Sequence, residues 1–312
     1  MDWSDRIGRR IRLRDLHVVL AVAEAGSMAK ASQKLAISHP VVSKTISDLE
    51  HTLGVKLFDR TSQGVELTAY GQALLKCGVN VFDDMRQGLR QIEFLTDPTS
   101  GDLAVGCPEI MNAGIMPAIS ARLLRQHPGV RLQVVHADMA LLQFNLLRER
   151  KVELLIGRMP DPFVEDDLVS EPLLQEPFVA VAGASSQWAR RRRVELADLM
   201  GESWVLPPHD STPGSIISGL FAASGLKSPR VAVATLSVQL TTTLIATGNF
   251  VGILPNSVAR FSAGRVGLKI LQTTIPATRY SIAILTVKNR TPGPFAKLFI
   301  EHARAVAKSL SI

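Results

Sequence analysis

The stretch SHPVVSKTISDLEHTLG, residues 38–54, constrains the fold of this chain more than any other. On a helical wheel at about 100° per residue, its apolar residues gather on one side: Val42, Ile46, Leu49 and Leu53. The opposite side carries small, polar or basic residues: Pro40, Ser43, Lys44, Ser47 and His51. Ser38 can cap this helix just ahead of Pro40, which suits a first helical turn, and Gly54 can end it. The stretch predicts a helix that buries one stripe and presents a small polar face.

Two further helices are predicted upstream of it. The first has apolar residues at the i, i+3, i+4 and i+7 spacing of one helical face: Leu16, Val19, Leu20 and Ala23. Gly26 suits the left-handed position that ends this helix. Ser27 can cap the next helix, MAKASQKLA, whose inward residues are Ala31 and Leu35. Two short helices joined by a tight turn predict a helix-turn-helix, in which the later helix enters the major groove of DNA.

The outward face of residues 38–53 suits contact with bases, because a helix approaches base edges only when no bulky side chain holds it off. Ser43 can bond to bases or phosphate, and Lys44 can reach guanine or phosphate. Pro40 or Val41 can touch a thymine methyl group. The alternative is an ordinary solvated helix face, and the pattern by itself leaves both interpretations open.

The next residues, VKLFDRTSQGVELTAYG, indicate a small β-hairpin. TSQG is a turn signal, and Val65 and Leu67 alternate with Glu66. Arg60 falls near the tip of this predicted wing, where an arginine suits the DNA backbone or a narrow minor groove. A plain surface hairpin is the alternative.

Thr68 can cap a long helix that reaches Leu95. Its apolar and small residues follow alternating spacings of three and four, which is typical of a heptad seam: Leu75, Gly78, Phe82, Met85, Leu89 and Ile92. The seam predicts a dimerisation helix, although a single helix packed on its own domain would show a similar stripe. TDPTSGD at 96–102 breaks the helix and predicts a domain linker.

Beyond the linker, strand and helix patterns alternate, which predicts an α/β domain. Two lobes joined by crossing segments would enclose a cleft for a small ligand. The predicted divisions are a DNA-binding domain at 1–67, a linker helix at 68–97 and an effector domain at 98–312. Lobe I is predicted at about 101–170 plus 277–312, and lobe II at about 171–276.

The cleft is expected at strand ends and helix starts. The predicted effector-binding residues are Cys107, Pro108, Glu109, Asn112, Asp138, Pro208, Ser211, Thr212, Thr235 and Phe250. Ser211 and Thr212 precede a predicted helix, where they and its free N–H groups could bind a carboxylate or phosphate. A simple N-cap is the equally favoured alternative for this pair.

Charge and composition narrow the function classes. The net charge is +7, but residues 1–100 carry 13 basic and 12 acidic residues, so charge alone does not indicate DNA binding there. The run 190–193, four arginines, predicts a solvated helix start rather than a second DNA contact. Two cysteines, Cys77 and Cys107, exclude a disulfide framework and a four-cysteine zinc site. The uncharged stretch 231–259 is interrupted by polar residues and proline, which predicts a buried strand, helix and strand rather than a membrane span.

No catalytic or metal-binding motif is predicted. S-x-x-K occurs twice, at 27–30 and 224–227, but without the K-T-G that accompanies it in penicillin-recognising enzymes. H-E-x-x-H, G-x-S-x-G and the phosphate-binding G-x-x-x-x-G-K-[ST] are absent from the sequence. We therefore predict a protein that is not an enzyme and has no cofactor, with no signal peptide and a cytoplasmic location.

Residues 13–75 resemble the N-terminal domain of LysR-type transcriptional regulators. The elements AEAGS, the helix-turn-helix, LGVKLFDR and GVELTAYG occur there in order. VRLQVVHA, VELLIGR and GNFVGILP are looser similarities further along the chain.

This resemblance implies a winged helix-turn-helix, a dimerising linker helix and a two-lobed effector domain of periplasmic-binding-protein type. It also implies a homotetramer built as a dimer of dimers, promoter DNA as partner, RNA polymerase as a further candidate partner, and bending that a small metabolite changes. By position, the DNA-binding residues are Ser38, His39, Pro40, Val41, Ser43 and Lys44, with Arg60 in the wing, and Ser47 shares their outward face. His39 stands where the family commonly has glutamine, which can pair with adenine through two hydrogen bonds. The first cleft loop reads CPEIMN where many relatives hold serine or threonine, which weakens the case for a simple acidic effector.

The sequence thus predicts a transcriptional regulator whose promoter binding responds to a small-molecule effector. An effector-independent architectural DNA-binding protein is the main alternative. A solute-binding module whose N-terminal domain serves another protein is the second. The sequence does not identify the effector, and sugars, sugar acids and aromatic acids all remain open.

Overall fold

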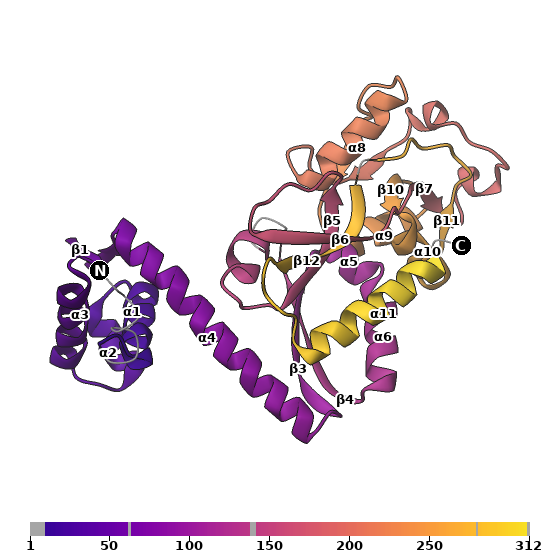
Figure 1. The fold of residues 1–312 in the computed structure, drawn as a ribbon. Coiled ribbons are helices and arrows are strands. Elements are labelled where there is room, and N and C mark those ends of the chain that lie inside the picture. The colour runs from indigo at the N-terminus through magenta and orange to yellow at the C-terminus, as the bar shows by residue number, and fades with distance from the viewer. Residues whose placement is uncertain (1–9, 62–63, 138–141, 279, 311–312) are drawn as a thin grey trace. The chain divides into compact units, whose positions relative to one another are not determined.

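The computed structural model describes residues 10–61, 64–137, 142–278 and 280–310. Residues up to Arg90 form one compact unit, and residues from Gln91 onward form another (Figure 1). The predicted effector residue Asp138 lies outside the described residues.

The first unit contains three helices, a hairpin and most of a long fourth helix. Its elements are α1 (Leu13–Ala25), α2 (Met28–Leu35), α3 (His39–Leu53), β1 (Phe58–Thr61), β2 (Gly64–Leu67) and α4 (Ala69–Thr96). The core joins all three helices to the hairpin through fully buried side chains such as Val19, Ala31 and Val42. The helix-turn-helix and wing predicted from the sequence are therefore present.

The helix ends follow the predicted glycines but not the predicted caps. Gly26 and Gly54 adopt the left-handed conformation that ends α1 and α3. Ser27 and Ser38 occupy the N-cap positions, yet neither hydroxyl makes a capping bond, so this part of the prediction is wrong. For Ser38 the reason is local: Pro40 has no N–H to donate, and the Val41 N–H donates to the Ser38 carbonyl instead. Thr68 does cap α4, because its hydroxyl accepts a hydrogen bond from the Gly71 N–H.

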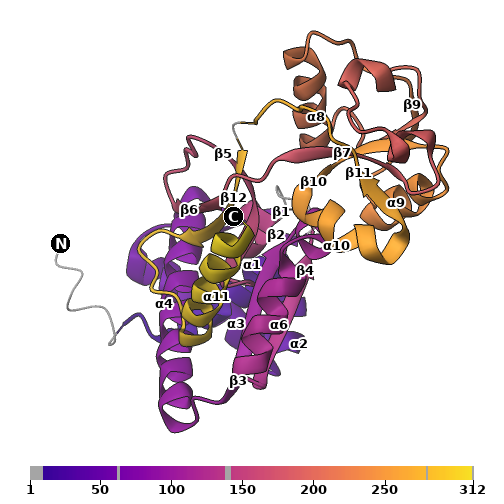
Figure 2. The same ribbon diagram turned by 90° about the vertical axis from the view of Figure 1, so that its right-hand side faces the viewer.

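The second unit contains two five-stranded sheets. The first has the order β4-β3-β5-β12-β6. Its strands are β3 (Ser100–Cys107), β4 (Gly129–His136), β5 (Leu154–Pro160), β6 (Leu168–Leu174) and β12 (Tyr280–Val287). β3 runs parallel to β4 and β5, whereas β12 runs antiparallel to β5 and β6. Helices α5 (Glu109–Ala113), α6 (Met116–Gln126) and α11 (Pro294–Leu310) accompany this sheet, and α11 lies beside α6 (Figure 2).

The second sheet has the order β11-β7-β10-β8-β9. Its strands are β7 (Phe178–Gly183), β8 (Trp204–Leu206), β9 (Val231–Ala234), β10 (Val251–Pro255) and β11 (Leu268–Ile270). Its helices are α8 (Thr212–Ala223), α9 (Val238–Ala246) and α10 (Asn256–Val266), with short 3-10 turns at η2 (Gln187–Arg190) and η3 (Leu196–Leu199). The uncharged stretch 231–259 spans β9, α9, β10 and the start of α10, as predicted. Among the described residues, no helix is both long enough and apolar enough to cross a membrane.

Each sheet is buried on both faces, because successive side chains of a strand point to opposite sides. In β12, Ile282 and Ile284 face α6 and α11, whereas Ala283 and Leu285 face the other side. The second sheet packs α8 on one face and α9 and α10 on the other. The second unit therefore consists of two lobes with separate cores, as the alternating strand and helix pattern predicted.

Between β4 and β5, the described residues include a π-helical turn, η1 (Leu142–Leu147). One boundary differs from that predicted. The predicted lobe boundary at 170–171 falls inside β6, which pairs with β12 of the first sheet. The chain therefore crosses to the second lobe only between Leu174 and Phe178.

Candidate DNA-binding surface and effector pocket

The outer face of α3 is open to solvent. Val42 and Ile46 on its inner face are fully buried and hold the helix against α1 and α2. Six of the predicted DNA-binding residues on this helix and its N-cap are exposed: Ser38, His39, Pro40, Val41, Lys44 and Ser47. Ser43 is half-buried. Thr45 is buried, and its hydroxyl donates to the Val41 carbonyl at 2.9 Å rather than facing outward. The face thus combines small polar side chains with one long basic side chain.

Glu50 fixes the end of α3 to the start of the wing. Its carboxylate accepts hydrogen bonds from the backbone N–H groups of Leu57 (2.9 Å) and Phe58 (3.4 Å), and it pairs with the Lys56 ammonium at 2.6 Å. Burial raises the pKa of Glu50, but these donors outweigh burial, so the pKa lies below its ordinary value. An ionised, buried Glu50 therefore orients the hairpin relative to the recognition helix.

The wing also contacts the end of α1. In the hairpin, Arg60 pairs with Val65, and the Val65 N–H donates to the Gly26 carbonyl at 3.0 Å. Gly64 has φ +145°, and a Cβ atom there would lie 2.2 Å from that same carbonyl oxygen. Only glycine fits this contact, because any side chain would push the wing away from α1. The backbone of Arg60 is therefore held in the wing, where it pairs with Val65 across the hairpin.

The apolar seam of α4 has two different environments. The first part of the seam packs against α1 within the first unit: Gly78 contacts the Leu20 side chain, and the centre of the Phe82 ring lies 5.7 Å from that of the His17 ring. Leu75 and Phe82 are accordingly half-buried. Further along, the apolar side chains are largely exposed: Met85, Leu89, Ile92 and Leu95. The predicted dimerisation residues thus include a packed group and an exposed apolar stripe.

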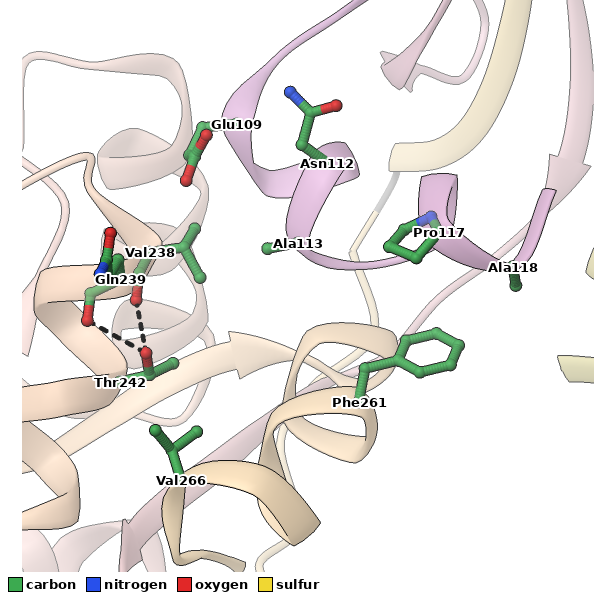
Figure 3. Close-up of a pocket in the computed structure, with 10 residues that line it drawn as sticks. All are labelled: Glu109, Asn112, Ala113, Pro117, Ala118, Val238, Gln239, Thr242, Phe261 and Val266. Atoms are coloured by element: carbon green, nitrogen blue, oxygen red, sulfur yellow. Dashed lines mark hydrogen bonds between the residues drawn. The ribbon is translucent and has the colours of Figure 1, made fainter. Parts of the chain in front are cut away.

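A pocket of about 510 Å³ lies between the two lobes. On the side of the first lobe it is lined by Glu109, Asn112 and Ala113 of α5 and by Pro117 and Ala118 of α6. The second lobe contributes Val238, Gln239 and Thr242 of α9 and Phe261 and Val266 of α10. Figure 3 shows Glu109 and Ala113 of α5 on the side toward α9, with Phe261 and Val266 on α10. Its size falls within the range of about 300–1,000 Å³ that is usual for small-molecule sites.

The polar groups beside the pocket are ordered by local bonds. The Cys107 thiol donates to Asn112 Oδ1 at 2.9 Å. Burial, and then the nearby Glu109 charge, raise the pKa of Cys107 to about 12, so the thiol stays protonated and inert as a nucleophile. On the opposite wall, the Thr242 hydroxyl donates to the carbonyls of Val238 (2.9 Å) and Gln239 (3.1 Å). Its oxygen can therefore only accept a bond from a ligand.

The predicted effector residues separate into two groups. Glu109 and Asn112 line the pocket, Cys107 supports Asn112 from beneath, and Pro108 precedes α5. The others lie outside the lining of this pocket: Pro208, Ser211, Thr212, Thr235 and Phe250. Ser211 is an N-cap, as the alternative stated, because its hydroxyl accepts from the Gly214 N–H. Thr235 accepts a bond from the Ser237 N–H, and Phe250 packs against the second core.

The lining residues of α6, α9 and α10 were not predicted from the sequence. Prediction concentrated on loops, whereas the pocket is walled mainly by helix sides. Val238 and Thr242 lie one helical turn apart, which was a detectable signal. Which helices of the two lobes face each other depends on the lobe packing, and the sequence does not show it. In the described parts of the chain, no group of three or more potential metal ligands is found.

A buried ion pair ties the lobes together beside the crossover. Arg158 of β5 and Glu176 are 2.6 Å apart, with side chains only 8% and 3% exposed. The second Glu176 oxygen accepts from the Ser257 N–H at the start of α10. The Arg158 guanidinium also lies 4.5 Å from the centre of the Phe178 ring. The first sheet, the crossover segment and the second lobe therefore meet at the Glu176 carboxylate.

A winged helix-turn-helix joined by a long helix to two α/β lobes with a pocket between them defines a DNA-binding protein with a ligand-binding domain. Residues 13–72 match the family described as bacterial regulatory helix-turn-helix protein, lysR family. Residues 96–308 match the LysR substrate binding domain. The chain belongs to the LysR family of transcriptional regulators, which confirms the resemblance seen in its sequence.

Known proteins are similar along almost the whole chain. It is 27% identical over 304 residues to the uncharacterised regulator YdcI of Escherichia coli, covering 97% of this chain and 98% of the relative. It is 24% identical to the regulator GbpR of Azospirillum brasilense, covering 96% and 87%. Among solved structures, full-length CbnR with its target DNA matches with TM-score 0.61 and 24% identity, covering 95% and 100%. A full-length OxyR variant from Pseudomonas aeruginosa matches with TM-score 0.67 and 20% identity, covering 96% and 95%. These structural matches support the fold.

Proposed function

We propose that this regulator reads promoter DNA with the outer face of α3 and its wing, and that a small molecule in the inter-lobe pocket changes that binding. The observation that supports it most is the α3 face itself. Its outward residues are small or polar, while Val42 and Ile46 anchor the helix from behind. A helix with this surface can lie in the major groove without being held away from the bases.

Individual residues have distinct roles in this proposal. Lys44 contacts phosphate or guanine, and Ser43 bonds to a base edge or phosphate. Val41, which is 40% exposed, contacts a thymine methyl group. His39 makes one edge or phosphate contact. Arg60 lies on a strand of the wing, and in this proposal it contacts the DNA phosphates or the minor groove.

We also propose that the exposed stripe of α4 forms the dimer contact. Leu89 and Ile92 are 58% and 61% exposed, on the part of the helix beyond its packing against the first unit. Apolar side chains at this spacing are stabilised when a partner helix covers them. A dimer places two recognition helices on successive half-sites, and pairs of dimers give the tetramer that the resemblance implied.

The relatives named above are transcriptional regulators, and we propose that this chain likewise acts by binding rather than by catalysis. Its site of action would be the cytoplasm, where bacterial promoter DNA lies. An effector-independent architectural protein is the competing function. That protein would bind DNA without sequence preference, and its DNA bending would not respond to any small molecule.

Fluorescence anisotropy on the DNA upstream of the protein's own gene tests the α3 assignment. Lys44→Glu should weaken binding strongly and Ser43→Ala more mildly. Lys44→Glu should leave the thermal unfolding midpoint unchanged, because Lys44 is exposed. Lys308→Glu removes the same charge from an exposed position on α11 and serves as the control. Affinity should also fall steeply with salt, because phosphate contacts dominate. Unchanged affinity in both α3 variants would reject the assignment.

A further inference from the structure

The inter-lobe pocket has an unbalanced charge. Of the ten described residues that line it, Glu109 is the only one with a formal charge, and none is Lys or Arg. Its carboxylate is 39% exposed, at an edge of the pocket. Among the described residues, the basic group that faces it is His136, whose Nε2 lies 3.9 Å away. A histidine is charged only when protonated, so within the described parts of the chain this carboxylate has no permanently charged partner.

We propose that the effector is an organic amine: a cationic primary ammonium group on an apolar body. The inference rests on the proposed function, in which this pocket holds the effector, and it adds the chemical class of that ligand. The ammonium would pair with the Glu109 carboxylate, which accepts hydrogen bonds and offers none.

The opposite wall fits the same head group. The Thr242 hydroxyl already donates its proton to backbone carbonyls of α9, so only its lone pairs face a ligand. An ammonium group has three donors and no acceptor. It can therefore bond to Glu109, while the Thr242 oxygen on the opposite wall has no free proton that would require an acceptor on the ligand. A carboxylate ligand would meet a like charge at Glu109 and an oxygen without a proton at Thr242.

Asn112, which also lines the pocket, adds a hydrogen-bond donor. Because the Cys107 thiol stays protonated and bonds to Oδ1, the Asn112 NH₂ group is the end left for the ligand. A hydroxyl or ether oxygen on the ligand would satisfy it. The remaining lining is apolar, and Phe261 and Val266 are 39% and 38% exposed in the open pocket. An aryl or alkyl body would cover both side chains and remove that surface from water.

A purely structural role for Glu109 is the competing explanation. An acidic residue in the first turn of a helix is stabilised by the positive end of the helix dipole. That role needs no ligand, so Glu109→Gln would alter stability slightly and leave every ligand affinity unchanged. The two explanations therefore differ in a binding measurement.

Isothermal titration calorimetry on the full-length protein separates them. The probes are hexylamine, phenethylamine and tyramine, each matched with a carboxylate of similar body: heptanoate, hydrocinnamate and phloretate. At least one amine should bind the wild type, and Glu109→Gln should weaken it roughly tenfold or more, as expected for a lost charged hydrogen bond. Glu301→Gln, at an exposed position of α11, should leave it unchanged.

Glu109→Lys provides a second variant with the opposite expectation. It should lose the amines and gain affinity for at least one carboxylate. The inference is overturned if the wild type prefers a carboxylate, if amine binding survives Glu109→Gln, or if no probe binds. Binding to promoter DNA, measured on the same preparations without probe, keeps the proposed function separate. Intact DNA binding with failed amine binding rejects only the ligand class, whereas lost DNA binding with intact amine binding rejects the DNA-binding role.

Discussion

Removal of the Glu176 charge should destabilise the second unit far more than removal of an exposed charge. Arg158 is nine-tenths buried, and its Nε has no hydrogen-bond partner among the described residues. Burial lowers the pKa of Arg158, yet arginine does not lose its proton in proteins. Glu176→Gln therefore leaves a buried cation without a counter-ion, a change that costs about 3–5 kcal/mol.

Urea unfolding followed by tryptophan fluorescence measures this loss, because Trp188 and Trp204 both lie in the core of the second lobe. With an m-value of about 2–3 kcal/mol per molar urea, the unfolding midpoint should fall by roughly 1–2.5 M. Glu171→Gln is the matched control, since Glu171 pairs with Arg304 at 2.6 Å on the surface. Its loss should cost less than about 1 kcal/mol.

A double variant identifies the cause. Arg158→Met with Glu176→Leu removes both charges and fills the space with apolar atoms, so much of the stability should return. The reasoning would be refuted if Glu176→Gln shifted the midpoint no more than Glu171→Gln, or if the double variant were as unstable as the single one.

Three further predictions concern the first unit and α4. Gly64→Ala should destabilise the wing by about 1–3 kcal/mol through backbone strain. Gly88→Ala, which has open space around its Cβ, should instead stabilise α4 by about 0.5–1 kcal/mol. Equal effects of the two variants in thermal unfolding would contradict the close contact between Gly64 and the Gly26 carbonyl. The pKa of Glu50 is lower in the folded protein than its ordinary value. The stability that ionised Glu50 contributes is therefore fully present above the ordinary pKa, and it is lost as the pH falls through the folded pKa. Glu50→Gln should thus cost about 1–3 kcal/mol at neutral pH and flatten the acid limb of a stability–pH profile, and an unchanged profile would reject this role. Leu89→Asp should dissociate the oligomer in analytical ultracentrifugation while Arg86→Asp, beside the stripe, should not; retention of the assembly by both would place the dimer contact elsewhere.

The elements with one strong periodicity were predictable. The apolar stripe through Val42, Ile46 and Leu49 located α3. Gly26 and Gly54 located the C-terminal ends of α1 and α3. The strand, helix and strand predicted in the uncharged stretch 231–259 are β9, α9 and β10, and the Ser237 hydroxyl caps α9. In each case the signal lies within one element and its immediate flanks.

The parts that failed depend on partners distant in sequence. β6 is an edge strand with Pro172 in it and Val169 exposed, so its pattern is weak and only its pairing with β12 defines it. The pocket likewise requires α5 to face α9, which the packing of two lobes determines. Glu109 and Asn112 were found because they follow a strand, whereas Thr242 and Phe261 lie on helix sides that carry no local mark of function.

A DNase footprint on the DNA upstream of the protein's own gene tests the central claim most directly, with wild type, Lys44→Glu and Lys308→Glu side by side. The account predicts protection of an interrupted, roughly palindromic site by the wild type and Lys308→Glu, and loss of that protection in Lys44→Glu. Protection that spreads without sequence preference and survives Lys44→Glu would contradict it and favour the architectural function.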